Sequence, residues 1–231
     1  METIIHRASE RGSGEYGWLS TRYSFSFANW YNPARMGFGA LRVLNDDVIA
    51  SSSGFGMHTH QDMEIITIVM QGAVTHEDSM GNMKSVSAGE VQVMSAGTGV
   101  AHAERNASKT VPLELFQLWI SPRERGVVPR YEQKTFTDSS ALLVSPDGRE
   151  GSLSIGQNAF ISRVRLAPPQ AQAYTLFGSA HGAYIVVVSG SVTVGDTTLG
   201  ARYAVGISGV DTITMTAHDS AELLVIEVPM L

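Results

Sequence analysis

Short apolar segments separated by glycine and proline run along the whole chain. Most of them are rich in β-branched or aromatic residues, which favours strands over helices. No long stretch has the 3.6-residue periodicity of an amphipathic helix. Strands are expected at residues 40–44, 64–70, 73–77, 91–94 and 113–120. The pattern therefore predicts an all-β protein of the sandwich or barrel type.

The two halves of the chain have related patterns. Residues 69–75 (VMQGAVT) match residues 187–193 (VVSGSVT), and residues 89–93 match residues 200–204. Residues 121–150 have the composition of a loop and form the candidate linker. We therefore expect two β-barrels from one duplicated unit, an N-terminal barrel at 1–134 and a C-terminal barrel at 135–231.

Two pairs of side chains with metal-binding chemistry occur at strand spacing: His58 with His60, and His102 with Glu104. Side chains at i and i+2 point to the same face of a strand. Two adjacent strands would therefore aim three imidazoles and one carboxylate at one point. This set lacks the thiolates of most structural zinc sites and has too few oxygens for calcium. The alternative is a group of ordinary solvated or core histidines.

We expect these four residues to hold one divalent transition metal per chain, with Fe(II) as the first expectation and Mn, Ni, Co, Cu and Zn as alternatives. An octahedral ion would keep about two positions open for substrate or O2. In the second half, the positions that match His102 and Glu104 fall near Ile213 and Met215. The metal is therefore predicted in the N-terminal barrel only.

Glu104 is also the candidate catalytic residue, because a carboxylate beside a metal can accept a proton from a bound hydroxyl. Glu64 shares the parity of His58 and His60. It is expected either to orient a histidine from outside the ligand set or to make a structural pair. His76 is a candidate for the same outer position or for the pocket, with a structural role as the alternative.

Aromatic residues cluster near the N-terminus. Some of them are expected to form an apolar wall beside the metal for a planar substrate, and the alternative is that they cap one end of a barrel. The candidate pocket residues are Phe25, Phe27, Met36, Phe38 and His76.

The spacing Gly54-x3-His58-x-His60-x3-Glu64-x7-Gly72 resembles the first cupin motif, and Gly89-x12-His102-x3-Asn106 resembles a modified second motif. Two segments are similar to the pirin family, and within it to bacterial pirin-like quercetinases: HTHQDMEIITIVMQGAVTHEDSMGN and AGEVQVMSAGTGVAHAERN. The similarity runs through nearly the whole chain.

This resemblance implies a bicupin fold of two jelly-roll barrels (double-stranded β-helices), with Glu104 rather than Glu64 as the carboxylate ligand. It also implies quercetin 2,3-dioxygenase activity, in which a flavonol reacts with O2 and CO is released. The alternative, implied by the resemblance to mammalian-type pirins, is a metal-dependent regulatory module that binds protein partners and has no turnover of its own.

Composition argues against several other classes of protein. Hydrophobic content of 43% with 16% charged residues is typical of a folded globular protein. A net charge of −6 without a basic stripe argues against direct nucleic-acid binding. The absence of cysteine excludes disulfides and thiolate ligands. No signal peptide or membrane-length apolar run is visible. We therefore expect a cytoplasmic monomer that does not bind membranes, with a flavonol-like aromatic substrate and O2 as its partners.

Overall fold

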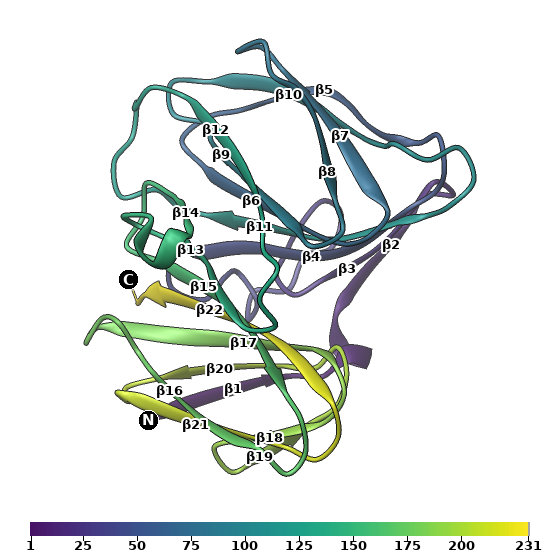
Figure 1. Cartoon of the computed structure of the whole chain (residues 1–231). Helices are drawn as coiled ribbons and strands as arrows, with labels where there is room; N and C mark the ends of the chain where they lie inside the picture. The colour runs from purple at the N-terminus through teal and green to yellow at the C-terminus, as the bar shows by residue number, and fades with distance from the viewer. Residues whose placement is uncertain (231) are drawn as a thin grey trace.

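The computed structural model describes residues 1–230 and confirms the predicted all-β, two-barrel architecture (Figure 1). Each barrel combines a long sheet with a four-stranded sheet. Two 3-10 turns, η1 (Ala8–Glu10) and η2 (Arg149–Gly151), interrupt the strands. Among residues 1–230, no helix has the length and apolar character needed to cross a bilayer.

The first barrel surrounds the predicted metal ligands. Its long sheet has the order β12 (Arg130–Thr135), β9 (Glu90–Ser95), β6 (Glu64–Gln71), β11 (Leu113–Ile120), β4 (Leu41–Ile49), β3 (Leu19–Tyr23) and β2 (Gly12–Glu15). Its second sheet has the order β5 (Gly54–His60), β10 (Val100–Asn106), β7 (Ala73–Asp78) and β8 (Met83–Ser87).

The second barrel repeats this plan. Its long sheet has the order β1 (Glu2–His6), β20 (Ala204–Ser208), β17 (His181–Ser189), β22 (Ala221–Pro229), β15 (Phe160–Leu166), β13 (Ala141–Ser145) and β14 (Leu153–Ser154). Its second sheet has the order β16 (Ala171–Thr175), β21 (Thr212–Ala217), β18 (Val192–Val194) and β19 (Thr197–Leu199).

Strand β21 has the same place in the second barrel that β10 has in the first. Its Ile213 and Met215 are buried in an apolar core. These two positions, which match His102 and Glu104, therefore carry neither an imidazole nor a carboxylate.

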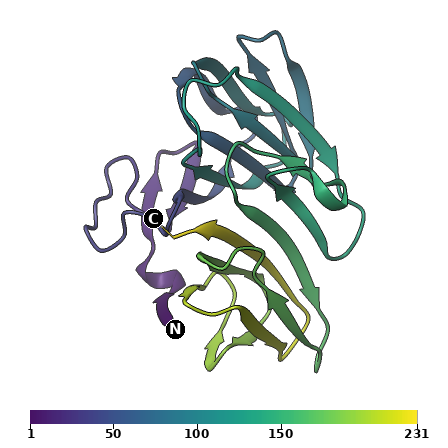
Figure 2. The same ribbon diagram turned by 90° about the vertical axis from the view of Figure 1, so that its left-hand side faces the viewer.

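Strand β1 departs from the expected division at residue 134. It pairs antiparallel with β20, from Glu2 opposite Ser208 to His6 opposite Ala204, and therefore belongs to the sheet of the second barrel. Figure 1 and Figure 2 show this purple segment beside the green and yellow strands. In the first barrel the corresponding edge of β9 is covered by β12. Both edges are covered because exposed edge strands invite wrong pairing.

The barrels pack through the faces of their long sheets. The largest apolar cluster draws buried residues from both, including Leu41, Phe116, Tyr184 and Leu224. Along β11, Phe116 and Leu118 point to this inter-barrel core, so the residues between them point into the first barrel. That alternation leaves the interior of the first barrel available for polar chemistry.

Candidate metal centre

Strands β5 and β10 lie antiparallel and bring three histidines together. His102 is opposite His58, and His60 is two residues further along the same face. The ring centroids of His58, His60 and His102 are 4.5 to 4.9 Å apart. One nitrogen from each ring lies within 4.8 Å of the others. The donor set therefore fits one ion between the strands.

A β-bulge gives this pair of strands its shape. The register shifts between His102 and Glu104, so that Glu104 lies opposite Phe55. The extra residue in β5 turns Phe55 to the same face as His58, as bulges beside active sites commonly do. Glycine is required at Gly54, since a Cβ there would collide with the backbone oxygen of Glu104. This explains the first glycine of the motif.

The protonation of the histidines suits metal binding. The Nδ1–H group of His58 donates to the carbonyl of Gly56 at 2.8 Å, which leaves Nε2 as a free acceptor. Burial, followed by the charge of His58, lowers the pKa of His60 to about 4. Burial, followed by the same charge, lowers the pKa of His102 to about 3. Neutral imidazoles are the form that binds metals.

His102 shows most directly that the residues fit an ion. Its side chain is only 1% exposed, and within residues 1–230 neither ring nitrogen has a hydrogen-bond partner. Buried polar groups are almost always paired, so an unpaired imidazole indicates a missing ligand. A divalent metal bound by His58, His60 and His102 would give a ring nitrogen of His102 a partner.

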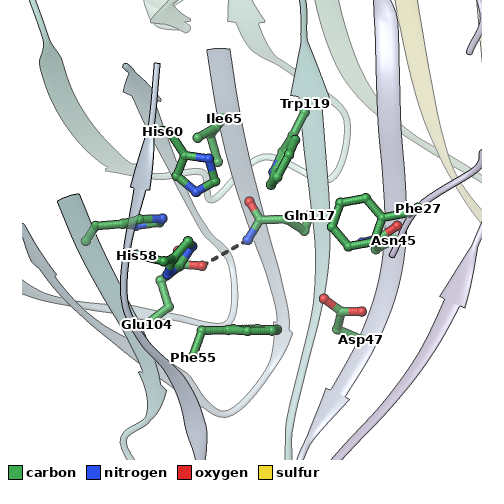
Figure 3. Close-up of a pocket in the computed structure, with 11 residues that line it drawn as sticks. Phe27, Asn45, Asp47, Phe55, His58, His60, Ile65, Glu104, Gln117 and Trp119 are labelled. Atoms are coloured by element: carbon green, nitrogen blue, oxygen red, sulfur yellow. Dashed lines mark hydrogen bonds between the residues drawn. The ribbon is translucent and has the colours of Figure 1, made fainter. Parts of the chain in front are cut away.

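Glu104 is clamped by side chains from the opposite sheet. Its Oε1 accepts hydrogen bonds from Thr67 Oγ1 at 3.1 Å and from the Nε2 of Gln92. Its Oε2 accepts from Gln117 Nε2 at 2.9 Å (Figure 3). Tyr131 in turn donates its hydroxyl to Gln92 Oε1 at 3.0 Å. The carboxylate is therefore held in a fixed orientation inside the barrel.

The four expected ligands do not form a single group in this structure. Instead, Glu104 joins a second triplet with His76 and His102, again with donor atoms within 4.8 Å. His102 is shared by both triplets. The Nε2 of His76 pairs with Asp78 Oδ2 at 2.9 Å, and its ring stacks on Tyr131 with centroids 4.4 Å apart. The other nitrogen of His76 has no hydrogen-bond partner in the described chain.

A cavity of about 190 Å³ opens beside the histidines, a size for a small molecule rather than a macromolecule. Figure 3 shows His58 and His60 on one side of this space and Phe27 and Trp119 on the other. The lining residues are Phe27, Asn45, Asp47, Phe55, His58, His60, Ile65, His102, Glu104, Gln117 and Trp119.

Four of the five pocket residues expected from sequence do not line this cavity, and one of them, His76, lies beside His102 and Glu104 instead. Phe25 and Phe38 are 1% and 5% exposed in the inter-barrel core, where both rings contact Tyr184. Met36 is 40% exposed and does not line the cavity. Phe27 lines it and contacts Trp119. Alternation would place Phe25 and Phe27 on one face, but residues 24–26 are not a strand, so Phe25 enters the inter-barrel core and Phe27 lines the cavity.

Glu64 does not orient a histidine. Its carboxylate accepts from Ser95 Oγ at 2.6 Å and faces the second barrel near Gly156, and burial raises its pKa. The parity argument failed because residues 61–63 between β5 and β6 are not a strand, with Asp62 at φ 50°. The expectation of a structural pair describes this residue better.

Several site residues were missed from sequence: Asn45, Asp47, Phe55, Thr67, Gln92, Gln117 and Trp119. A signal for some of them existed. Asn45 and Asp47 are polar at i and i+2 on the face of β4 that also carries Val43 and Ile49, and Gln117 interrupts the apolar run of β11. Such an isolated polar residue on an inward face indicates a buried polar site.

Two duplicated β-barrels, with histidines and a glutamate in the first barrel that could hold a metal ion, define a bicupin. Residues 5–120 match the family model Pirin, and residues 142–228 match the model of the quercetinase C-terminal cupin domain. The chain belongs to the pirin family.

Relatives cover nearly the whole chain. Quercetin 2,3-dioxygenase of Escherichia coli K12 is 43% identical over 227 residues, which is 97% of this chain and 98% of that protein. A pirin-like protein of Caulobacter vibrioides is 40% identical over 94% of this chain and 95% of its own. The crystal structure of the bacterial pirin YhhW from Escherichia coli in complex with nickel(II) superposes with a TM-score of 0.96 at 42% identity, covering 100% of both chains.

Proposed function

We propose that this protein is a metal-dependent dioxygenase that opens the central ring of quercetin or a related flavonol with O2 and releases CO. The observation that carries the proposal is the group of three histidines facing an aromatic-walled cavity. The name of the 43% identical Escherichia coli enzyme supports the reaction.

One divalent ion per chain is held by His58, His60 and His102, with Glu104 as the fourth ligand. The nickel(II) complex of the related bacterial pirin supports a divalent first-row metal, and we expect Fe(II) as the native ion. When bound, such an ion supplies Lewis-acid polarisation of a substrate oxygen and a template for the reactants.

Glu104 receives the proton of the flavonol 3-hydroxyl. The described structure gives Oε1 two donors, Thr67 and Gln92, but gives Oε2 only Gln117. Oε2 therefore keeps a lone pair that can coordinate or accept a proton. The clamp holds this oxygen in place, which favours a positioned general base. Removing the proton makes the flavonol more electron-rich and prepares it to react with O2.

The aromatic walls hold the flat substrate and exclude water. Phe27, Phe55 and Trp119 border the cavity, and stacked or edge-on ring contacts favour a planar polyphenol. Exclusion of water protects the reactive anion from protonation by solvent.

The test combines metal analysis with turnover. Protein loaded with Fe(II), and in parallel with Mn(II), Ni(II) or Co(II), is given quercetin under O2 while substrate loss and CO are measured. We expect one ion per chain and CO in proportion to the quercetin consumed. Protein that is fully loaded but yields no CO would refute the dioxygenase and favour the metal-dependent regulatory module that binds protein partners.

A further inference from the structure

Two polar side chains in the cavity each have an oxygen without a hydrogen-bond partner in residues 1–230. Asn45 and Asp47 project from β4 and are 4% and 2% exposed. Within residues 1–230, the Oδ1 atom of each is buried and accepts no hydrogen bond. Leaving a buried polar atom unpaired costs free energy, so such atoms call for an explanation.

These atoms lie across the cavity from the metal ligands. Figure 3 shows Asn45 and Asp47 on one side, His58 on the other, and Gln117 between them. The amide of Gln117 is already committed to Glu104. A ligand that reaches from the histidines to β4 therefore meets two free acceptors at its far end.

The neighbouring acid on the same strand behaves differently. Asp46 pairs with Arg11 at 3.2 Å and with Arg202 at 3.1 Å, so its charge is balanced. Asp47 makes no ion pair in the described part of the chain. Burial is the largest cause that raises the pKa of Asp47 to about 7, and the hydroxyl of Thr21 offsets part of this rise. Its carboxyl group can therefore accept from a hydroxyl when ionised or donate to one when protonated.

We propose that Asp47, together with Asn45, is the specificity-determining pair that recognises a phenolic hydroxyl at the end of the substrate that lies away from the metal. This inference rests on the proposed function, because it takes the ligand to be a flat phenol. A site built to bond a hydroxyl rejects analogues that lack it, since its own polar groups would stay unpaired. Unpaired groups of this kind are expected where function outweighs stability.

The experiment measures binding without turnover. Protein is loaded with Zn(II), which has no redox chemistry. In the absence of oxygen it is titrated with quercetin and, separately, with 3-hydroxyflavone, which keeps the 3-hydroxyl but lacks the hydroxyls on the two outer rings. We expect quercetin to bind at least about tenfold more tightly, the value of one hydrogen bond to a charged or buried group.

Three variants assign this preference. Asp47→Leu removes both bonding atoms and is expected to bring the two affinities close together, whereas Asp47→Asn retains one acceptor and part of the preference. Asp47→Leu should also raise the melting temperature, because a buried carboxyl group without an ion-pair partner disappears. Asp46→Asn is the matched control on the opposite face of the strand. It should lower the melting temperature and leave the preference unchanged.

Each other result overturns the inference. Equal affinities in the parent, no binding of either compound, or a full preference in Asp47→Leu would refute recognition by this pair. A lower melting temperature in Asp47→Leu would assign the residue to stability. Failure of the proposed function is seen separately, as absence of CO from metal-loaded parent protein that still binds quercetin selectively.

Discussion

Replacing His102 with alanine should remove metal binding without unfolding either barrel. His102 belongs to both groups of candidate ligands, His58–His60–His102 and His76–His102–Glu104. Its loss leaves each group with two donors, and no other group of three was found in residues 1–230. The ring itself makes no hydrogen bond in that range, so its removal leaves no partner unpaired.

The size of the effect follows from linkage between binding and folding. At a metal concentration of 100 times the parent dissociation constant, the ion stabilises the protein by about 2.7 kcal/mol. Loss of a ligand should weaken binding at least about 100-fold, since even outer-shell losses cost about 10–100-fold. At the same metal concentration the variant would then gain only about 0.4 kcal/mol. In a chain of this size the thermal shift falls from about 5–10 °C to about 1 °C.

Thermal unfolding with and without Ni(II) or Zn(II), together with calorimetric titration, measures both quantities. His218→Ala is the matched control, because the His218 ring lies in the second barrel and bonds Thr193 there. This variant should keep the full increase in melting temperature that metal causes in the parent. If His102→Ala binds one ion per chain with parental affinity, the ligand assignment is wrong. Two ions per chain in the parent would show a second site that the residues do not predict.

Three further results are expected. Glu104→Gln keeps the shape of the side chain but removes its basicity, so turnover per bound metal should fall by about 10²–10⁴. The defect should shrink as pH rises. Parental turnover in the metal-loaded variant would exclude Glu104 as the general base. Phe27→Ala should weaken quercetin binding at unchanged metal content. Phe38→Ala should instead lower the free energy of unfolding by about 3–5 kcal/mol, because Phe38 packs in the core. A larger loss of stability in Phe27→Ala than in Phe38→Ala, measured by denaturant titration, would contradict these two roles. Burial, then the charge of Arg35, lowers the pKa of His6 to about 4 in the folded protein. The unfolded chain therefore binds more protons between pH 6.5 and 4, and about 3 kcal/mol of stability is lost as pH falls through that window. A slope of stability against pH that is no flatter in His6→Gln would refute this assignment.

Sequence alone determined the features that depend on neighbours along one strand. The pairs His58–His60 and His102–Glu104 had to share a face wherever their strands lay, because side-chain direction alternates residue by residue. The turn glycines of the motif were also readable: Gly72 has φ +78° and Gly89 has φ +90°, which few other residues tolerate. The match between residues 69–75 and 187–193 likewise indicated the duplication.

The tertiary structure decided what depends on more than one strand. The bulge in β5 turned Phe55 into the site, and the turn at residues 61–63 directed Glu64 away from it. The clamp on Glu104 comes from three separate strands of the facing sheet. Strand β1 pairs with β20, which begins about two hundred residues later in the chain. Alternation predicts the direction of side chains only along a continuous strand. Bulges, turns and cross-barrel contacts depend instead on how distant strands pair and pack.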